Sequence, residues 1–131
     1  MGAAYDMGRK SMARAEAKDR EGWLSLFADD AVVQDPVGPS PFDAEGHGQR
    51  GIDAITAFYD NVISASEKVR FDMRQSAEGA DECAFAGTIY ITLPGGQEGS
   101  VELVNIYKVT PDGQKLASLR SFWEFDKLKF G

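Results

Sequence analysis

The chain has 131 residues, of which 43% are hydrophobic and 27% are charged, the balance of an ordinary globular protein. This length predicts a single domain, residues 1–131, with one hydrophobic core. The 21 acidic side chains outnumber the 14 basic ones, and the net charge of −7 argues against a surface for nucleic acid or an anionic membrane, since both require clustered positive charge.

The sequence argues against a zinc protein, a disulfide-stabilised protein and a membrane protein. Cys83 and His47 are each the sole residue of their kind, so neither an internal disulfide nor a zinc site of the usual His/Cys type can be assembled. No apolar run approaches the roughly 18 residues of a membrane span, and the first ten residues lack the apolar region of a signal peptide. We therefore expect a cytoplasmic protein without a metal.

The first half of the chain predicts two helices, a short strand and a long loop. Residues 4–18 are rich in helix-favouring side chains, and Asp19 is typical of the N-cap of a second, shorter helix over 20–27. Residues 31–35 have strand character. Residues 36–50 contain three prolines and three glycines, which indicates a loop longer than most connections, of the kind that often forms a lid.

In the second half, helical spacing gives way to strand alternation. Apolar residues recur with helical spacing over 52–62, and from residue 69 onward the period changes to two. Four strands are predicted, at residues 69–77, 83–93, 100–110 and 115–126. The order of elements predicts an α+β fold in which three helices pack in a curved, mixed or antiparallel sheet and enclose an apolar pocket.

Alternation along the predicted strands assigns side chains to two faces of the sheet. One face of the 100–110 strand carries Val101, Leu103, Asn105, Tyr107 and Val109. Asn105 is the polar exception in a set that is otherwise mostly apolar. The opposite face of the sheet includes Val104, Ile106 and Phe122, so apolar area is present on both faces. We expect one face to pack the helices and the other to pack a second copy, giving a homodimer.

The segment 26–38 (LFADDAVVQDPVG) contains the clearest candidate for chemistry. Asp35 follows the predicted strand and precedes Pro36, which favours extended geometry in the residue before it. A carboxylate at the end of a strand is well placed to act as a general base. An Asp-Pro pair is also typical of a simple turn, and the pattern by itself leaves both interpretations open.

This segment, the helical AFYDN and the SLRSFWEFD of the last strand resemble the Δ5-3-ketosteroid isomerases. These enzymes belong to the nuclear-transport-factor-2-like superfamily, which includes the SnoaL-like proteins. The chain is also similar to mycobacterial homologues of the isomerase through KDREGWLSLFADD and FWEFDKLKFG, and the resemblance covers residues 10–131. It implies a cone-shaped fold with an apolar pocket, and a steroid Δ-isomerase-like activity that needs no cofactor.

The resemblance also implies roles for individual residues. Asp35 matches the general base that moves a proton between two carbons of the steroid, and Asn105 stands where the family has a protonated aspartic acid that donates to the enolate oxygen. Tyr59 matches a tyrosine that supports the oxyanion hole. The positions implied to contact the substrate are Trp123, Ser121, Leu103, Val101, Ile89, Ile91 and Ser11.

Three features depart from the family pattern. Ser11 occupies the place of the oxyanion tyrosine, and Tyr5 lies too early to replace it, by roughly 9 Å along a helix. Asn105 replaces a carboxylic acid with a neutral amide, which donates more weakly. The 36–50 loop is several residues longer than in the isomerases. Because losing one oxyanion donor typically costs about 10²–10³ in rate, we expect a weak isomerase or an inactive one.

Several assignments have a purely structural alternative. Asn105 could be a satisfied polar group within a strand, Tyr59 a structural hydrogen bonder, and Trp123 a packing residue of the core or dimer. His47 is expected to be a solvated loop residue. At the level of function, a non-catalytic steroid- or lipid-binding protein and a polyketide-cyclase- or dehydratase-like enzyme remain open beside the isomerase. In each case the expected partner is a small apolar molecule, such as a steroid or polycyclic ketone.

Overall fold

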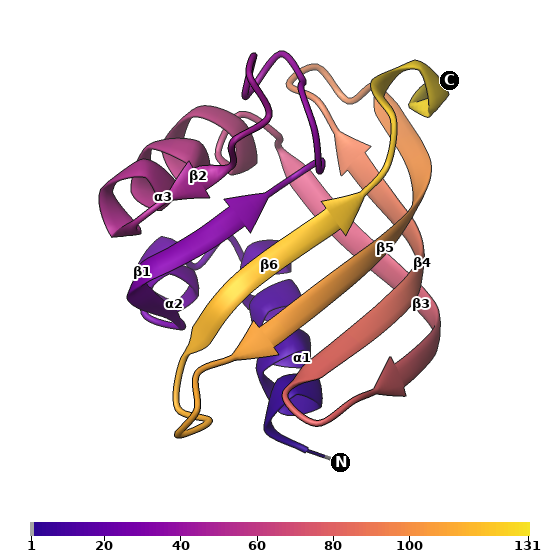
Figure 1. The fold of residues 1–131 in the computed structure, drawn as a ribbon. Helices are drawn as coiled ribbons and strands as arrows, with labels where there is room; N and C mark the ends of the chain where they lie inside the picture. Colours follow the sequence, from indigo (N-terminus) through magenta and orange to yellow (C-terminus); the bar gives the residue numbers. More distant parts are fainter. Residues whose placement is uncertain (1) are drawn as a thin grey trace.

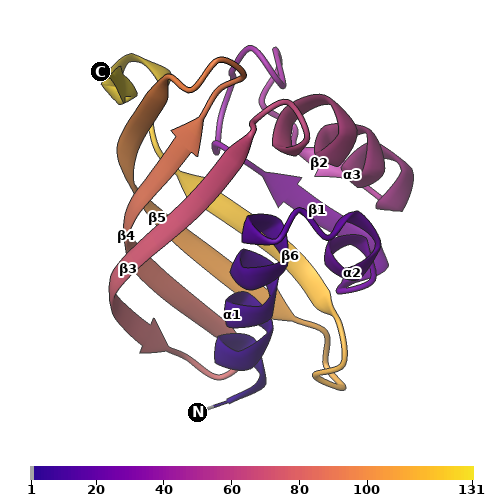
Figure 2. The same cartoon turned by 180° about the vertical axis from the view of Figure 1, so that it is seen from behind.

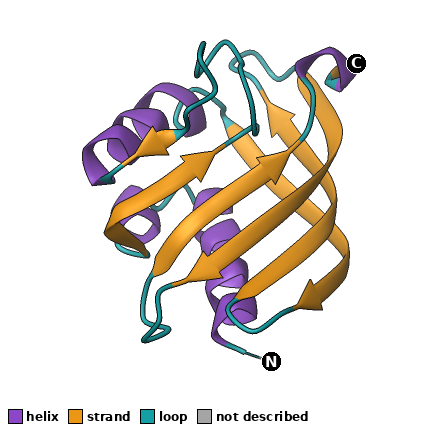
Figure 3. Ribbon diagram, viewed as in Figure 1, coloured by secondary structure: helices purple, strands orange, loops and turns teal. Residues whose placement is uncertain are grey.

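The computed structural model describes residues 2–131, in which a curved sheet wraps around three helices (Figure 1 and Figure 3). The helical elements are α1 (Ala3–Glu16), α2 (Arg20–Leu24), α3 (Ile52–Phe58), the π-helical turn η1 (Tyr59–Ile63) and the 3₁₀ turn η2 (Phe125–Lys127). The strands are β1 (Phe27–Gln34), β2 (Gln49–Arg50), β3 (Lys68–Glu78), β4 (Glu82–Thr92), β5 (Glu98–Val109), β6 (Leu116–Phe122) and β7 (Lys129–Phe130). The predicted α+β cone is confirmed.

The sheet is mixed, because one of its pairings is parallel. The strand order is β2-β1-β6-β5-β4-β3, and β7 pairs with β5. β1 runs parallel to β6, with Gln34 opposite Arg120, whereas the neighbouring pairs are antiparallel. This register brings Asp35, the residue after β1, to the level of Ser121 in β6. Residues far apart in the sequence thereby meet at one end of the cone.

Helix α1 lies across the concave face of the sheet, as Figure 2 shows from behind. The close approach depends on Gly8, where a Cβ would stand 2.6 Å from Cε2 of Phe85 and 2.8 Å from Cδ2 of Tyr107. Both aromatic rings are buried in the core between helix and sheet. Burying such a side chain contributes roughly 1.5–3 kcal/mol, which outweighs the cost of about 0.5–1 kcal/mol for a glycine inside a helix. Within residues 2–131, no helix has both the length and the apolar character to cross a membrane.

The predicted strands and helices are present, and their ends differ from the expected ones. β1 begins at Phe27 rather than at residue 31, because Phe27 already pairs with Leu116 of β6. The third helix continues beyond Phe58 as a π-helical turn. The last strand ends at Phe122, after which η2 and the two-residue strand β7 return the chain to β5. β2 and β7 were not predicted, since two residues are too short to show a period of two.

Candidate active site

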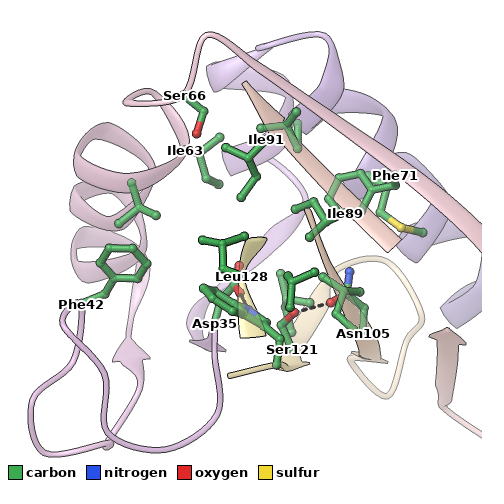
Figure 4. Close-up of a pocket in the computed structure, with 18 of the residues that line it drawn as sticks. Asp35, Phe42, Ile63, Ser66, Phe71, Ile89, Ile91, Asn105, Ser121 and Leu128 are labelled. Carbon is green, nitrogen blue, oxygen red and sulfur yellow. Dashed lines mark hydrogen bonds between the residues drawn. The ribbon is translucent and has the colours of Figure 1, made fainter. Parts of the chain in front are cut away.

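A cavity lies inside the cone, with apolar walls and a polar group of side chains at one end (Figure 4). Its volume is about 230 Å³, larger than the cavity of about 150 Å³ that admits benzene in an engineered core. The predicted substrate-contacting residues all line it: Ser11, Ile89, Ile91, Val101, Leu103, Ser121 and Trp123. The size and lining suit a rigid apolar molecule that carries few polar groups.

Five polar side chains gather at one end, which we call the polar end of the cavity. They are Ser11, Asp35, Asn105, Tyr107 and Ser121. Figure 4 shows Asp35, Asn105 and Ser121 together, and Ile63, Ile91 and Ser66 at the opposite end. α1, β1, β5 and β6 each contribute to the polar end, or lead directly into it. A ligand that fills this cavity therefore meets its polar contacts mainly at one end.

Asp35 is half-buried where β1 leads into the 36–50 loop. Its Oδ1 accepts a hydrogen bond of 2.7 Å from Nε1 of Trp123. Burial raises the pKa of Asp35 above its ordinary value, and the hydrogen bond from Trp123 offsets part of that rise. A carboxylate with a raised pKa is a better proton acceptor than an ordinary aspartate. The structure thus places a carboxyl group with a raised pKa against an apolar cavity.

Asn105 occupies the middle of the polar end and is 3% exposed. Its Nδ2 donates to the hydroxyl oxygen of Tyr107 at 3.2 Å, and its Oδ1 accepts from the hydroxyl of Ser121. Among residues 2–131, every fully buried side-chain nitrogen and oxygen has a hydrogen-bond partner. An amide nitrogen has two hydrogens, so one N–H of Asn105 remains for a ligand oxygen.

Ser11 completes the polar end from α1. It is 1% exposed, and its Oγ accepts a hydrogen bond of 3.2 Å from Nε1 of Trp23. The indole of Trp23 also lines the cavity, a contact that the sequence did not predict. Position 11 therefore contributes a small hydroxyl, already engaged by an indole, rather than a large phenol.

Tyr59 is the predicted site residue that the structure does not bring to the cavity. Its ring is 2% exposed and packs on Trp23, with ring centroids 5.4 Å apart. Burial raises the pKa of its hydroxyl, and the charged groups near it are Asp19, Arg20 and Asp60. Any support that Tyr59 gives the polar end passes through the indole of Trp23. The ring of Tyr59 lies against α2, the helix to which Trp23 belongs.

Residues that the sequence did not assign to the site also line the cavity. The rim is formed by Phe42 of the long loop and by C-terminal side chains, with the rings of Phe42 and Phe125 5.1 Å apart. Of the C-terminal residues that line the cavity, Trp123 was predicted, whereas Phe125, Leu128 and Phe130 were not. Tyr107 was also missed as a site residue, although its placement on the same predicted face as Asn105 was an available signal. For the C-terminal residues no sequence pattern indicated a return to β5.

The titratable side chains do not form a metal site within the described residues 2–131, where no group of three or more His, Cys, Asp or Glu has suitable geometry. His47 is exposed and contacts Glu45 in the loop, with Nε2 3.0 Å from Oε2. The cavity instead contains one carboxyl group, neutral hydrogen-bonding side chains and apolar walls. That combination suits proton transfer next to a carbonyl group, or tight binding of a ketone.

Comparison with known families gives the class of the protein. The model of the SnoaL-like domain matches residues 9–118, which is most of the chain. The chain therefore belongs to the SnoaL-like family, and its fold is of the nuclear-transport-factor-2 type. The predicted membership of this superfamily is confirmed.

Three solved structures show which proteins of this fold the chain is similar to. The Δ5-3-ketosteroid isomerase from Mycobacterium sp. is 32% identical, with a TM-score of 0.92 and coverage of 100% of both chains. RV0760c from Mycobacterium tuberculosis, in complex with estradiol-17beta-hemisuccinate, is 31% identical, with a TM-score of 0.89 and coverage of 99% of this chain and 100% of that one. A computationally designed 17-OHP binder is 31% identical, with a TM-score of 0.91 over both whole chains. The expected similarity to mycobacterial ketosteroid isomerase and its homologues is thus confirmed.

Proposed function

We propose that this protein binds a steroid or a similar polycyclic ketone and moves a proton α to its carbonyl group, with Asp35 as the general base. The observation that carries the proposal is the half-buried Asp35 carboxylate at the polar end of an apolar cavity, hydrogen-bonded to Trp123 and close to Asn105. The similarity to a Δ5-3-ketosteroid isomerase and to a protein crystallised with a steroid derivative supports the choice of substrate class.

The proposed reaction needs no oxidant, reductant or cofactor. On a 5-ene-3-ketone, the Asp35 carboxylate takes a proton from C4, and the electrons of that C–H bond move into the carbonyl to give a dienolate. The same proton is returned to C6, which moves the double bond from C5–C6 to C4–C5 and regenerates the carboxylate. Asn105 would donate to the dienolate oxygen, and the apolar walls would exclude water, which strengthens both interactions.

The experiment compares native protein with Asp35→Asn in the isomerisation of 5-androstene-3,17-dione, followed by the ultraviolet absorbance of the conjugated product. We expect the rate to fall by about 10²–10⁴, with affinity for the steroid retained. Asp30→Asn is the matched control, since Asp30 is an exposed carboxylate of the same segment. Equal rates for native and Asp35→Asn protein, or no rate for either, would contradict the isomerase proposal.

A non-catalytic steroid-binding protein is the second candidate, and Ser11 favours it. A strong hydrogen-bond donor at position 11 would stabilise an enolate. The cavity has at this position a serine hydroxyl, which accepts a hydrogen bond from Trp23. The similarity to a designed 17-OHP binder is consistent with binding by this scaffold. Tight binding of 4-androstene-3,17-dione with no isomerisation of the 5-ene isomer would select this candidate.

We also propose that two copies associate through the convex face of the sheet. Phe122 is 38% exposed there, and Val104 and Ile106 are half-buried on the same face. An apolar strip that crosses β5 and β6 in this way is suited to pack against its own copy by a two-fold axis. A monomer in sedimentation at micromolar concentration would contradict this part of the proposal.

A further inference from the structure

Tyr107 reaches the polar end of the cavity from β5, opposite Ser11 of α1. We propose that the Tyr107 hydroxyl is the principal hydrogen-bond donor to the carbonyl oxygen of the ligand, in the role that the sequence led us to look for at position 11. The inference rests on the proposed function in taking a ketone as the ligand. It adds a named donor, on a different element of the fold, to a site whose expected donor is absent.

The hydrogen-bond arrangement leaves the phenolic proton of Tyr107 available. Its oxygen accepts from Nδ2 of Asn105 at 3.2 Å, and the hydroxyl of Ser11 is a second hydrogen-bonding neighbour. Ser11 itself accepts from Nε1 of Trp23 at 3.2 Å, so its own proton can be directed to Tyr107. Because hydroxyl protons rotate, an entering acceptor completes a chain from Trp23 through Ser11 and Tyr107 to the ligand.

Two small residues on α1 make the space that the Tyr107 ring occupies. A Cβ at Gly8 would stand 2.8 Å from Cδ2 of the ring, and Ser11 lies nearly one turn further along the same buried side of the helix. A large side chain at position 11 would compete with Tyr107 for this end of the cavity. The serine and the tyrosine are therefore complementary: β5 supplies the phenol at the end of the cavity where α1 carries a small side chain.

The electrostatic setting keeps Tyr107 in its donating form. Burial raises the pKa of its hydroxyl well above the usual value, and the Asp35 carboxylate adds to that rise. The phenol consequently stays protonated throughout the range in which Asp35 acts as a carboxylate. A neutral donor and an anionic base then face the same cavity, as proton abstraction next to a carbonyl requires.

The test uses Tyr107→Phe, which removes one oxygen and leaves the ring packing in place. Two probes are bound: 4-androstene-3,17-dione, and the naphthyl ketone 2-acetyl-6-(dimethylamino)naphthalene, whose emission moves to longer wavelength when its carbonyl accepts a hydrogen bond. In Tyr107→Phe we expect this long-wavelength emission to be lost and steroid affinity to fall by about 5- to 10-fold. Isomerisation should fall by about 10²–10³, if it is present in the native protein.

One control and one comparison variant separate donation by Tyr107 from loss of structure and from donation by Ser11. Tyr5→Phe makes the same chemical change on a ring that also packs on Phe85, with centroids 5.4 Å apart, and should keep the long-wavelength emission. Ser11→Ala compares the two hydroxyls of the polar end: loss of the long-wavelength emission in Ser11→Ala together with its retention in Tyr107→Phe would assign the donor to Ser11 and overturn the proposal.

The outcomes also distinguish this inference from the proposed function. A Tyr107-dependent emission shift without steroid binding would overturn the steroid assignment and support the donor. Steroid isomerisation at an unchanged rate in Tyr107→Phe would support the steroid assignment and overturn the donor role of Tyr107. Failure of both ketones to bind would overturn the steroid assignment and the donor role together. If Tyr107→Phe does not fold, a crystal structure of the native protein with 4-androstene-3,17-dione decides the question. The ligand oxygen should lie about 2.5–3.0 Å from Oη of Tyr107, and a carbonyl directed elsewhere would contradict the proposal.

Discussion

The two faces of strand β5 share one backbone and differ in what their side chains can do. The concave face carries Val101, Leu103, Asn105 and Tyr107, none of them more than 5% exposed. The convex face carries Glu102, Val104, Ile106 and Lys108, which are exposed or half-buried. Polar groups on the concave face are satisfied by one another inside an apolar enclosure, whereas the convex face presents apolar side chains between charged ones. Under the proposals above, the concave face binds the ligand and the convex face packs against a second copy.

Between the two faces of β5, the larger effect is expected from removing the amide on the concave face. Asn105→Leu keeps the branched shape of the side chain and leaves Ser121 and Tyr107 without their shared partner. We expect steroid isomerisation to fall by about 10²–10³, the usual cost of losing a donor to a developing oxyanion. Val104→Leu, one residue away on the other face, is the control and should keep the native rate. Equal losses in the two variants would mean that the faces do not differ in function.

A charge on the convex face should have its effect on association instead. Ile106→Glu places a carboxylate in the proposed dimer contact, where burying it unpaired would weaken the dimer by about 10²-fold. Sedimentation velocity should show monomers for the variant at concentrations where the native chain is dimeric. Lys108→Ala, at an exposed position of the same face, should leave the native sedimentation unchanged. A native monomer, or a variant that stays dimeric, contradicts the assignment of this face.

The pH dependence of activity should report the hydrogen bond between Trp123 and Asp35. That bond, 2.7 Å long, holds down a pKa that burial raises. Trp123→Phe removes the donor, so the pKa of Asp35 rises further and the base becomes protonated at a higher pH. In kcat/KM profiles we expect the acid limb to move to higher pH in Trp123→Phe and to stay in place in Phe125→Leu. An unmoved limb in Trp123→Phe would show that Asp35 is not the group that titrates.

The smallest expected effect is on the free energy of unfolding, and the direction of its pH dependence follows from the pKa of Asp35. Because the pKa of Asp35 is raised in the folded state, its contribution to stability is fully present below the ordinary value of 3.8 and is lost as the pH rises through the folded value. Asn cannot ionise, so the free energy of unfolding of Asp35→Asn, relative to the native protein, should be greater at pH 7 than at pH 3.

Asp112 provides the matched control for this sign. Hydrogen bonds from Thr110 and from the backbone N–H of Gln114 lower the pKa of Asp112, so its contribution is present above 3.8 and is lost as the pH falls. Asp112→Asn should therefore change stability with the opposite dependence on pH in urea unfolding measurements. The same trend in both variants would contradict the buried environment assigned to Asp35.

Much of the fold was predictable because the chain keeps a clear period over long stretches. Alternation along residues 100–110 assigned Asn105 and Tyr107 to one face, and the structure agrees. The contacts between side chains of the polar end were harder to predict, since Ser11 and Tyr107 belong to elements that are far apart in the sequence. Comparison with the family motif points to the residue at position 11, whereas in the structure the phenol at this end of the cavity is that of Tyr107 in β5. Only the packing of α1 on the sheet, through Gly8, shows that they meet.

The rim of the cavity was not predictable for a different reason. Phe42 lies in a loop rich in proline and glycine, and β7 has only two residues, so neither has a periodic pattern that would place it in space. Tyr59 shows the converse case. Helical spacing correctly predicted a helical residue at this position, but Tyr59 is the first residue of the π-helical turn η1, and its ring packs on Trp23 instead of lining the cavity.

Proton abstraction by Asp35 is tested most directly by hydrogen exchange into the ligand. 4-Androstene-3,17-dione is incubated with the protein in heavy water, and loss of the hydrogen signals at C4 and C6 is followed by nuclear magnetic resonance. This measurement detects proton transfer even where net turnover is slow. The native protein should exchange these positions faster than buffer does, and Asp35→Asn should not. A native protein that binds the steroid and exchanges neither position would contradict the assignment of Asp35 as a base.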